Sequence, residues 1–377
     1  MTRIKIGLFC LVCMCIAAIS YAEVGVTDAE ILIGQSCALE GPAAGLGLEL
    51  KAGAEAYINQ VNREGGVNGR KIKLISYNDG YEPDTCIDNT RKLIDDDKVF
   101  LLFGYVGTPT ASAAIPIIDE VGIPFVGPFT GAGFLRDPQR KVFNIRGTYD
   151  QETGKLVKSF HRDMGFTKIA CLYQNDAYGK AGLSGVEKGL EAEGLTLAGS
   201  ATYERNTVAV KGAVATMKKI DPDAIIMVGA YKPCAAFIKL AKQIGINAKF
   251  ANISFVGTAN LIEEMGAAGE GTYISQVMPS PADTSIPVVR ECTDLLGRQP
   301  MYGELEGFVD AKVLVKGLDN AGANVTRAAF IGAMEDLSRY DAGGVIVSYG
   351  PGDHQGIDEV FLTKVIGGKP IPVEKLQ

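Results

Sequence analysis

Three residues with hydroxyl groups stand in loops where a small polar ligand could bind: Thr108, Tyr178 and Tyr231. Thr108 is the most informative, because Pro109 follows it. Threonine is favoured as a helix N-cap and proline at the first helical position, so a helix is predicted to begin here. Its dipole would point the positive end at the preceding loop, where a small carboxylate could dock. The alternative is that Thr108 only caps its own helix.

Tyr178 and Tyr231 occupy corresponding loops in the second half of the chain, and Tyr173 is a third aromatic residue near them. An aromatic face with a hydroxyl tip suits a cleft that closes, because it buries apolar ligand surface and still bonds polar atoms. A single tyrosine is more often a half-buried packing residue. Two at corresponding strand ends make a ligand contact an equally good interpretation.

Residues for catalysis are scarce. The chain has two histidines, His161 on a predicted helix surface and His354 in a turn, and neither has cysteines or carboxylates at metal-ligand spacing. The sequence contains no Walker loop, dinucleotide fingerprint or nucleophile elbow, and the glycine-rich segment 41–47 has the wrong spacing for them. We therefore expect a binding protein and not an enzyme, with no cofactor and no bound metal.

These residues need a scaffold, and the sequence predicts alternating strands and helices. Strands are predicted at 31–33, 71–74, 99–103 and 123–126, and then at 168–173, 195–203, 224–228 and 249–253. Helices are predicted at 48–62, 151–164, 179–193, 208–220 and 233–244. One helix between successive strands implies right-handed parallel crossovers, so each half is expected to form a doubly wound α/β sheet.

Five loops lie at the carboxyl ends of predicted strands, where ligands bind in open parallel sheets. They span residues 35–47, 104–110, 127–133, 174–179 and 229–233. No glycine- or serine-rich tether separates the two halves, so we expect two lobes joined by short crossing strands.

The first 22 residues have the pattern of a secretory signal peptide. Basic residues precede an apolar run at 6–19, and Ser20-Tyr21-Ala22 supplies the small residues for cleavage after Ala22. The run is too short for a permanent membrane helix. A lipoprotein anchored through Cys13 or Cys15 is the alternative, although neither cysteine follows a small residue.

Charge and cysteine content limit the partners and the covalent structure. Removal of residues 1–22 lowers the formal net charge from −7 to about −9, and no basic stripe remains, which argues against nucleic acid or an anionic membrane as partner. Five cysteines remain, so at most two bridges can form. Cys37 and Cys86 follow neighbouring predicted strands and are the best candidates for a disulfide, with the free thiols an equal alternative. Cys171 fits a buried small hydrophobic residue.

A series of short motifs carries a family resemblance. They are Ile33-Gly34-Gln35, Gly41-Pro42, Gly53-Ala54-Glu55, Gly65-Gly66-Val67-Asn68-Gly69, Tyr77-Asn78-Asp79, Phe103-Gly104, Asn175-Asp176-Ala177-Tyr178-Gly179 and Gly229-Ala230-Tyr231. In these motifs the chain resembles the periplasmic leucine/isoleucine/valine-binding proteins, which are substrate-binding components of ABC importers. The resemblance covers nearly the whole mature sequence.

The resemblance implies a type I periplasmic binding fold, an α/β architecture with two doubly wound parallel-sheet lobes joined by three crossover strands. The implied first lobe is 23–145 plus 276–343, and the second is 146–275 plus 344–377. It also implies a periplasmic protein that acts as a monomer, binds a small molecule and docks on a membrane permease.

Members of this family hold an α-amino acid between the lobes, and the resemblance assigns positions for it. Thr108 looks like the hydroxyl that receives the ligand carboxylate, and Tyr178 and Tyr231 look like the two tyrosines of the second lobe. The loop beside the carboxylate looks like Phe129, Thr130 and Gly131, and Leu46 stands where an aromatic residue is expected.

The acid that should pair with the ligand ammonium is missing. It is expected within 254–258, but that segment reads Ser-Phe-Val-Gly-Thr, from which Val256 is predicted to contact the ligand. An unpaired buried ammonium costs several kcal/mol. Either another acid replaces it, or the ligand is a carboxylate or amide without an ammonium, with an aromatic or branched body. The candidate replacements are Glu40, Asp176, Glu304 and Glu306.

We therefore expect an extracytoplasmic solute receptor that closes on its ligand like a hinge and presents the closed form to a permease. A sensor that reports ligand occupancy to a signalling receptor would use the same fold. A secreted hydrolase is the third candidate, and the absence of a nucleophile and base constellation argues against it.

Overall fold

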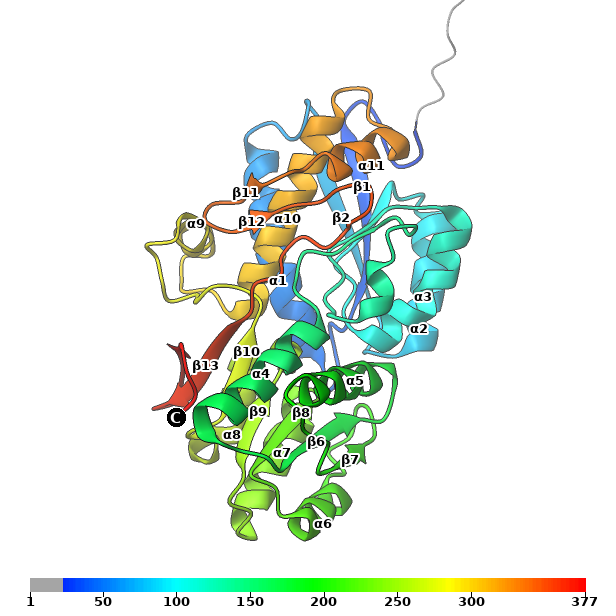
Figure 1. Ribbon diagram of the computed structural model, residues 1–377. Coiled ribbons are helices and arrows are strands. Elements are labelled where there is room, and N and C mark those ends of the chain that lie inside the picture. The colour runs from blue at the N-terminus through cyan, green and yellow to red at the C-terminus, as the bar shows by residue number, and fades with distance from the viewer. Residues whose placement is uncertain (1–22) are drawn as a thin grey trace, which may run out of the picture.

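Two β-sheets, each flanked by helices, organise residues 23–377, the part of the chain that this computed structural model describes (Figure 1). The first sheet is parallel throughout, with strand order β2-β1-β3-β4-β5. Its strands are β1 Glu30–Cys37, β2 Lys71–Asn78, β3 Leu101–Phe103, β4 Phe125–Val126 and β5 Val142–Phe143. We call this sheet and the helices packed on it the first lobe.

Helices cover both faces of the first sheet. One face packs against α2 (Pro83–Arg91) and α3 (Thr108–Val121) through a cluster that includes Leu102 and Ile118. The other face packs against four helices that come from distant parts of the chain. They are α1 Ala44–Arg63, α9 Pro287–Leu296, α10 Tyr302–Ala321 and α11 Arg327–Glu335. Short helical turns, η1 Lys92–Asp96 and η2 Gly133–Arg136, complete this lobe.

The second sheet has seven strands in the order β14-β13-β10-β9-β8-β6-β7. The strands are β6 Ile169–Gln174, β7 Gly199–Tyr203, β8 Ala224–Val228, β9 Lys249–Asn252, β10 Tyr273–Gln276, β13 Phe361–Ile366 and β14 Lys369–Val373. Strands β6 to β10 pair in parallel, but β13 and β14 pair antiparallel, so this sheet is mixed and not purely parallel. A tight turn at Gly367-Gly368, both at positive φ, permits that hairpin.

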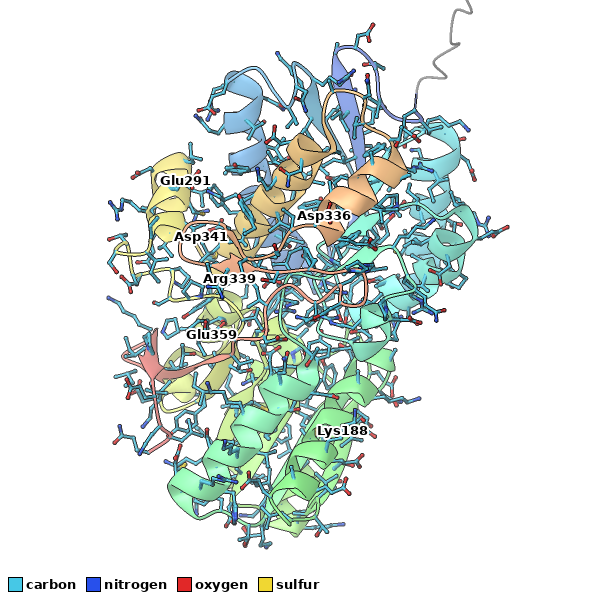
Figure 2. The ribbon with its side chains drawn as sticks, turned by 45° about the horizontal axis from the view of Figure 1, so that its top comes forward. Lys188, Glu291, Asp336, Arg339, Asp341 and Glu359 are labelled. Atoms are coloured by element: carbon cyan, nitrogen blue, oxygen red, sulfur yellow. The ribbon has the colours of Figure 1, made fainter. Side chains whose placement is uncertain are left out.

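The helices of the second lobe lie around this sheet in the lower half of Figure 1. They are α4 Tyr149–Met164, α5 Ala177–Ala192, α6 Lys211–Ile220, α7 Tyr231–Gln243 and α8 Thr258–Met265, with the short turns η3 Ser254–Val256 and η4 Gly266–Gly269. Charged residues such as Lys188 on α5 lie on the outside, where Lys188 bonds Asp150 of α4 at 2.6 Å (Figure 2).

The chain passes between the two sheets three times, after β5, after β10 and before β13. The last passage follows a small ribbon of β11 (Tyr340–Asp341) and β12 (Ile346–Val347). The first and last passages run side by side, since Asn144 bonds His354 and Gly356 through backbone groups at 2.9 and 2.8 Å. The architecture of two lobes and three crossovers is as predicted, and the residue boundaries of the lobes stay a prediction.

Two predictions concern cysteines and membranes. Cys37 and Cys86 are both free and buried, so the disulfide considered for them is absent. Burial raises the pKa of Cys86 to about 12, which keeps its thiol protonated. Within residues 23–377, no helix combines the length and apolarity that a membrane span requires. The predicted signal peptide lies outside the described residues.

Candidate functional site

The predicted ligand loops follow the carboxyl ends of β1, β3, β4, β6 and β8 and face one another across the two lobes. One continuous apolar cluster includes Leu46 and Phe129 from the first lobe with Tyr178, Tyr231 and Val256 from the second. We call this shared region the cleft. It brings together five of the residues that the sequence singled out for ligand contact, and Tyr173 packs at the margin of the same cluster.

The hydroxyl groups of Thr108 and Thr130 lie 2.6 Å apart, and both side chains are fully buried. Their two loops are tied together because Phe129 donates to Tyr105 at 2.8 Å and accepts from Gly107 at 3.2 Å. Helix α3 begins one residue earlier than predicted, with Gly107 as its N-cap at a φ of 104°, so Thr108 does not cap the helix. Its hydroxyl therefore does not bond the helix N-terminus and instead bonds the Thr130 hydroxyl.

Tyr149, which the sequence did not single out, is the third hydroxyl of this group. Its backbone N–H donates to Gly131 at 2.9 Å, and a Cβ added at Gly131 would lie 2.6 Å from the Tyr149 ring, so only glycine fits there. Burial raises the pKa of Tyr149, while the neighbouring hydroxyls of Thr130 and Thr108 lower it. Among the described residues, its hydroxyl has no well-formed hydrogen bond.

Phe255, on the η3 turn, sits at the centre of an aromatic group that spans both lobes. Its ring centroid lies 4.6 Å from Tyr178, 5.5 Å from Phe129, 6.1 Å from Tyr81 and 6.5 Å from Tyr149. Tyr81 and Phe129 belong to the first lobe, and the other three rings belong to the second. We call these five residues the aromatic centre. Such edge and offset contacts favour a well-packed apolar wall.

The two predicted tyrosines begin helices of the second lobe, as their loops implied. Asp176 caps α5 by accepting from the N–H groups of Tyr178 and Gly179, which holds the backbone of Tyr178 at the start of the helix. The Tyr178 hydroxyl is buried and has no partner within residues 23–377. The Tyr231 hydroxyl accepts from the Gly45 N–H at 3.3 Å and so bonds across the cleft.

Leu46 also reaches across the cleft. It is buried on α1, and a Cβ added at Gly257, after η3, would lie 2.8 Å from its side chain. Gly257 has a φ of 79°, so the turn needs glycine both for its backbone and for this close approach.

Two arginines lie near the hydroxyls of Thr108, Thr130 and Tyr149. Arg146 is buried, with its guanidinium 4.5 Å from the centre of the Phe129 ring, and it pairs with Glu306 at 3.0 Å. Arg136 donates to the carbonyl oxygens of Thr130 at 3.0 Å and Ala132 at 2.8 Å, which are neutral acceptors. Burial, with a further contribution from Arg146, lowers the Arg136 pKa to about 9. Two guanidinium groups therefore lie at this end of the cleft, and one of them is paired with a carboxylate.

The acids near the cleft are already engaged. Glu152 accepts from Ser254 at 2.8 and 3.0 Å and from Ser275 at 2.6 Å, and Glu306 pairs with Arg146. Asp176 is a helix cap, Glu304 bonds Arg298, and Glu40 is exposed. Of the four acids that the sequence offered as replacements, only Glu306 lines space inside the cleft.

That space is small. A cavity of about 10 Å³ is lined by residues of both lobes, which include Phe129, Ser254, Gly257, Glu49 and Glu306. Burial raises the pKa of Glu49 and of Glu306 to about 7. The lobes are thus closed on one another, and a ligand enters only if they separate.

Polar contacts surround the aromatic centre and join the lobes at its edge. Arg205 bonds Glu82 at 2.7 Å, and the Asn206 amide donates to Glu82 at 2.7 Å and to the Gly80 carbonyl at 3.1 Å. On another side, Asn260 of α8 donates to Glu49 of α1. We call these contacts the rim.

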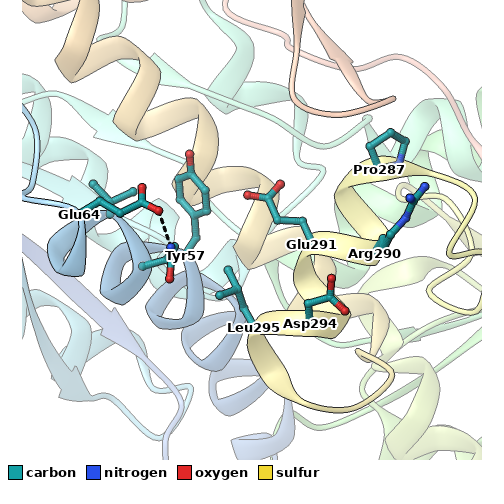
Figure 3. A pocket seen from close by; sticks show the side chains of 9 residues that line it. Tyr57, Glu64, Pro287, Arg290, Glu291, Asp294 and Leu295 are labelled. Atoms are coloured by element: carbon teal, nitrogen blue, oxygen red, sulfur yellow. Dashed lines mark hydrogen bonds between the residues drawn. The ribbon is translucent and has the colours of Figure 1, made fainter.

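A larger hollow of about 500 Å³ lies outside the cleft, between α1 and α9 (Figure 3). It is open to solvent and lined by Tyr57 and the acids Glu64, Glu291 and Asp294. None of the cleft residues contributes to it. No group of three or more His, Cys, Asp or Glu side chains in residues 23–377 could hold a metal ion.

Known proteins are similar to this chain in sequence and in fold. A family described as periplasmic binding protein matches residues 30–369. A Leu/Ile/Val-binding protein of Rhizobium johnstonii is 25% identical over 375 residues, which cover 95% of this chain and 97% of that protein. A possible leucine/isoleucine/valine-binding protein from Rhodopirellula baltica superposes with a TM-score of 0.87 at 32% identity, over 93% of this chain and 98% of the other. A substrate-binding periplasmic protein from Ralstonia solanacearum gives 0.85 at 32% identity, over 91% and 99%.

The fold and the cleft define a two-lobed solute-binding protein of the type I periplasmic class. The chain belongs to the periplasmic binding protein family, and its relatives are of the leucine/isoleucine/valine-binding type, which confirms the resemblance seen in the motifs. Those relatives are binding proteins, consistent with the expectation that this chain is not an enzyme.

Proposed function

We propose that this protein is an exported receptor of an ABC importer that closes on a small carboxylate-bearing solute and presents the closed form to a membrane permease. In this proposal the signal peptide is cleaved after Ala22 and the mature protein works as a monomer in the periplasm. Membership of the periplasmic binding protein family over residues 30–369 supports the export and import roles.

The observation that carries the ligand proposal is the buried pair of hydroxyls at Thr108 and Thr130, which faces aromatic residues of the opposite lobe. The ligand carboxylate accepts from these hydroxyls, with the loop at Phe129 and Gly131 beside it. Hydroxyl donors to a charged acceptor are favoured, and the guanidinium groups behind them add a positive field. Leu46, Tyr178, Tyr231 and Val256 form the wall around the ligand body.

Calorimetric titration of small carboxylates and amino acids into ligand-free protein tests this role. Thr130→Val is expected to weaken binding about 10- to 100-fold, because it removes one hydrogen bond to a charged group. Thr110→Val is the matched control, since the Thr110 hydroxyl is also buried but donates to the Val106 carbonyl just before α3, at 2.6 Å. Equal affinity in wild type and Thr130→Val would refute the site, and recovery of a chemically altered solute would refute a binding role.

A further inference from the structure

The hydroxyls of Thr108, Thr130 and Tyr149 form one end of the cleft, which we call the hydroxyl end. Within residues 23–377 no acid is hydrogen-bonded to these hydroxyls, and this limits the chemistry of the solute. The polar atoms of the hydroxyl end are the neutral groups of Thr108, Thr130 and Tyr149. The unpartnered Tyr178 hydroxyl is a fourth neutral group in the same cluster. None of them offers a negative charge, so an ammonium held there would keep its full desolvation cost.

Two guanidinium ions lie beside the hydroxyl end. Arg146 lies over the Phe129 ring at 4.5 Å and pairs with Glu306, and one of its guanidinium nitrogens, Nη1, is buried without a partner among residues 23–377. Burial lowers the Arg146 pKa, but the carboxylates of Glu306 and Glu152 raise it by more. Arg136 lies on the other side, bonded to the Thr130 carbonyl. Two positive groups beside one hydroxyl pair attract a carboxylate and repel an ammonium.

Acids that could offset an ammonium lie near the cleft, but they already have hydrogen-bond or ionic partners. Glu152 accepts three hydrogen bonds from Ser254 and Ser275, and Glu306 is 3.0 Å from Arg146. Glu49 and Glu306 do line the small cavity, but its volume of about 10 Å³ holds no more than a water-sized group. An ammonium placed there would also have to displace Arg146 or Asn260 from its present partner.

The remaining surface is aromatic. Phe255 contacts Tyr178 and Phe129 at ring distances of 4.6 and 5.5 Å, so an apolar ring from each lobe borders the hydroxyl end. An apolar or flat ligand body is bound well by such a wall, whereas a polar substituent beside the carboxylate would lose its water without a replacement partner.

We propose that the solute is an apolar carboxylic acid that carries no ammonium group, and that Phe255 is the residue that selects it. This inference rests on the proposed function, because it concerns the same cleft. It separates this chain from the amino-acid specificity that the names of its relatives state.

Matched ligand pairs that differ only in the ammonium group give the test. Isovalerate is paired with valine, isocaproate with leucine, and hydrocinnamate with phenylalanine, each titrated into the full mature chain after removal of bound solutes. We expect at least one member without an ammonium to bind about 10-fold or more tightly than its amino acid, a difference of about 1.4 kcal/mol. If no acid without an ammonium binds at least about 10-fold more tightly than its amino acid, the inference is overturned but the proposed function stands.

Failure of all six compounds and of a wider carboxylate panel to bind would instead overturn the proposed function, and the inference with it. The variant Phe255→Leu keeps the site apolar and supplies a second measurement. It is expected to weaken hydrocinnamate several-fold more than isovalerate, because only the aromatic ligand loses a ring contact. An equal loss for both would show that Phe255 is structural and does not select the ligand.

Discussion

Two arginines bridge the lobes in different surroundings, Arg146 beside the aromatic centre and Arg205 at the rim. Arg146 has a side chain only 1% exposed, and it holds Glu306, Ser254 and the face of Phe129 together. Arg205 is 24% exposed and bonds Glu82 across the cleft and Asp176 within its own lobe. The buried arginine cannot exchange its partners for water, whereas the rim arginine can.

This difference separates the two tasks of the cleft. In the proposed function the aromatic centre selects the ligand, since its rings and the hydroxyl and guanidinium groups beside them are buried. In the proposed function the rim sets how readily the lobes separate, since its contacts are few and polar. Changes at the centre should therefore alter stability or ligand preference, and changes at the rim should alter affinity for every ligand alike.

The largest effect is expected from Arg146→Met. It leaves Glu306 buried without its cation, which costs about 3–5 kcal/mol of unfolding free energy. Chemical denaturation measures this loss. Arg162→Met, which breaks the pair between Glu193 and an arginine side chain that is 60% exposed, is the control and should cost less than about 1 kcal/mol. Similar losses for the two variants would contradict the distinction between buried and exposed arginines.

A pH effect of intermediate size is expected from Glu49, the rim acid that Asn260 bonds. Burial, followed by the charge of Glu304, raises its pKa to about 7 from 4.5. The folded protein therefore binds this proton more tightly than the unfolded chain does. The stability it contributes is complete below about pH 4.5 and is lost as the pH rises through about 7, on the order of 3 kcal/mol in all.

Glu49→Gln isolates this contribution, because the amide keeps the shape and the bond to Asn260 but does not titrate. Unfolding free energy measured from pH 4.5 to pH 8 should fall less steeply in the variant than in the wild type. Parallel curves for the two proteins would show that the pKa of Glu49 does not change on unfolding.

The smallest effect is expected at the rim arginine. Arg205→Gln removes the pair with Glu82, which is worth about 0.2–1 kcal/mol at a partly exposed site. Affinity should fall by less than about five-fold for each ligand, with their order unchanged. Calorimetry on the isovalerate and valine pair checks this, and a reversed ligand order would mean that the rim also selects the solute.

Parts of this site follow from the sequence because they depend on local rules. Thr108 and Tyr178 stand where a parallel strand ends and a helix begins, and strand and helix patterns locate such points without knowledge of the partner lobe. The N-cap predicted for α3 was wrong by one residue, because Gly107 can adopt the positive φ that this position requires.

Other parts depend on long-range packing that one sequence does not reveal. Arg146 lies in the segment that crosses between the lobes after β5, and its partner Glu306 is far along the chain, on α10. Tyr149 begins α4, and its neighbour Thr130 lies in the loop after β4. Phe255 lies in the segment where an acid was sought, but its role depends on rings from both lobes. A capping box of Thr148 and Gln151 is the one local signal that could have pointed to Tyr149.

The antiparallel edge of the second sheet was missed for a related reason. Strand β13 pairs with β10, about ninety residues earlier in the chain, and β13 and β14 form a hairpin without an intervening helix. The alternation of strands and helices that predicted the rest of the sheet does not extend to this segment.

The central claim is that one solute is held between the hydroxyls of the first lobe and the aromatic residues of the second. A crystal structure of mature protein purified without removal of bound solutes tests it most directly. The account predicts density between the lobes, with a carboxylate within hydrogen-bonding distance of the Thr108 and Thr130 hydroxyls and an apolar body beside Phe255. A solute bound elsewhere, for example between α1 and α9, with the two threonine hydroxyls still bonded to each other and to no solute, would contradict it.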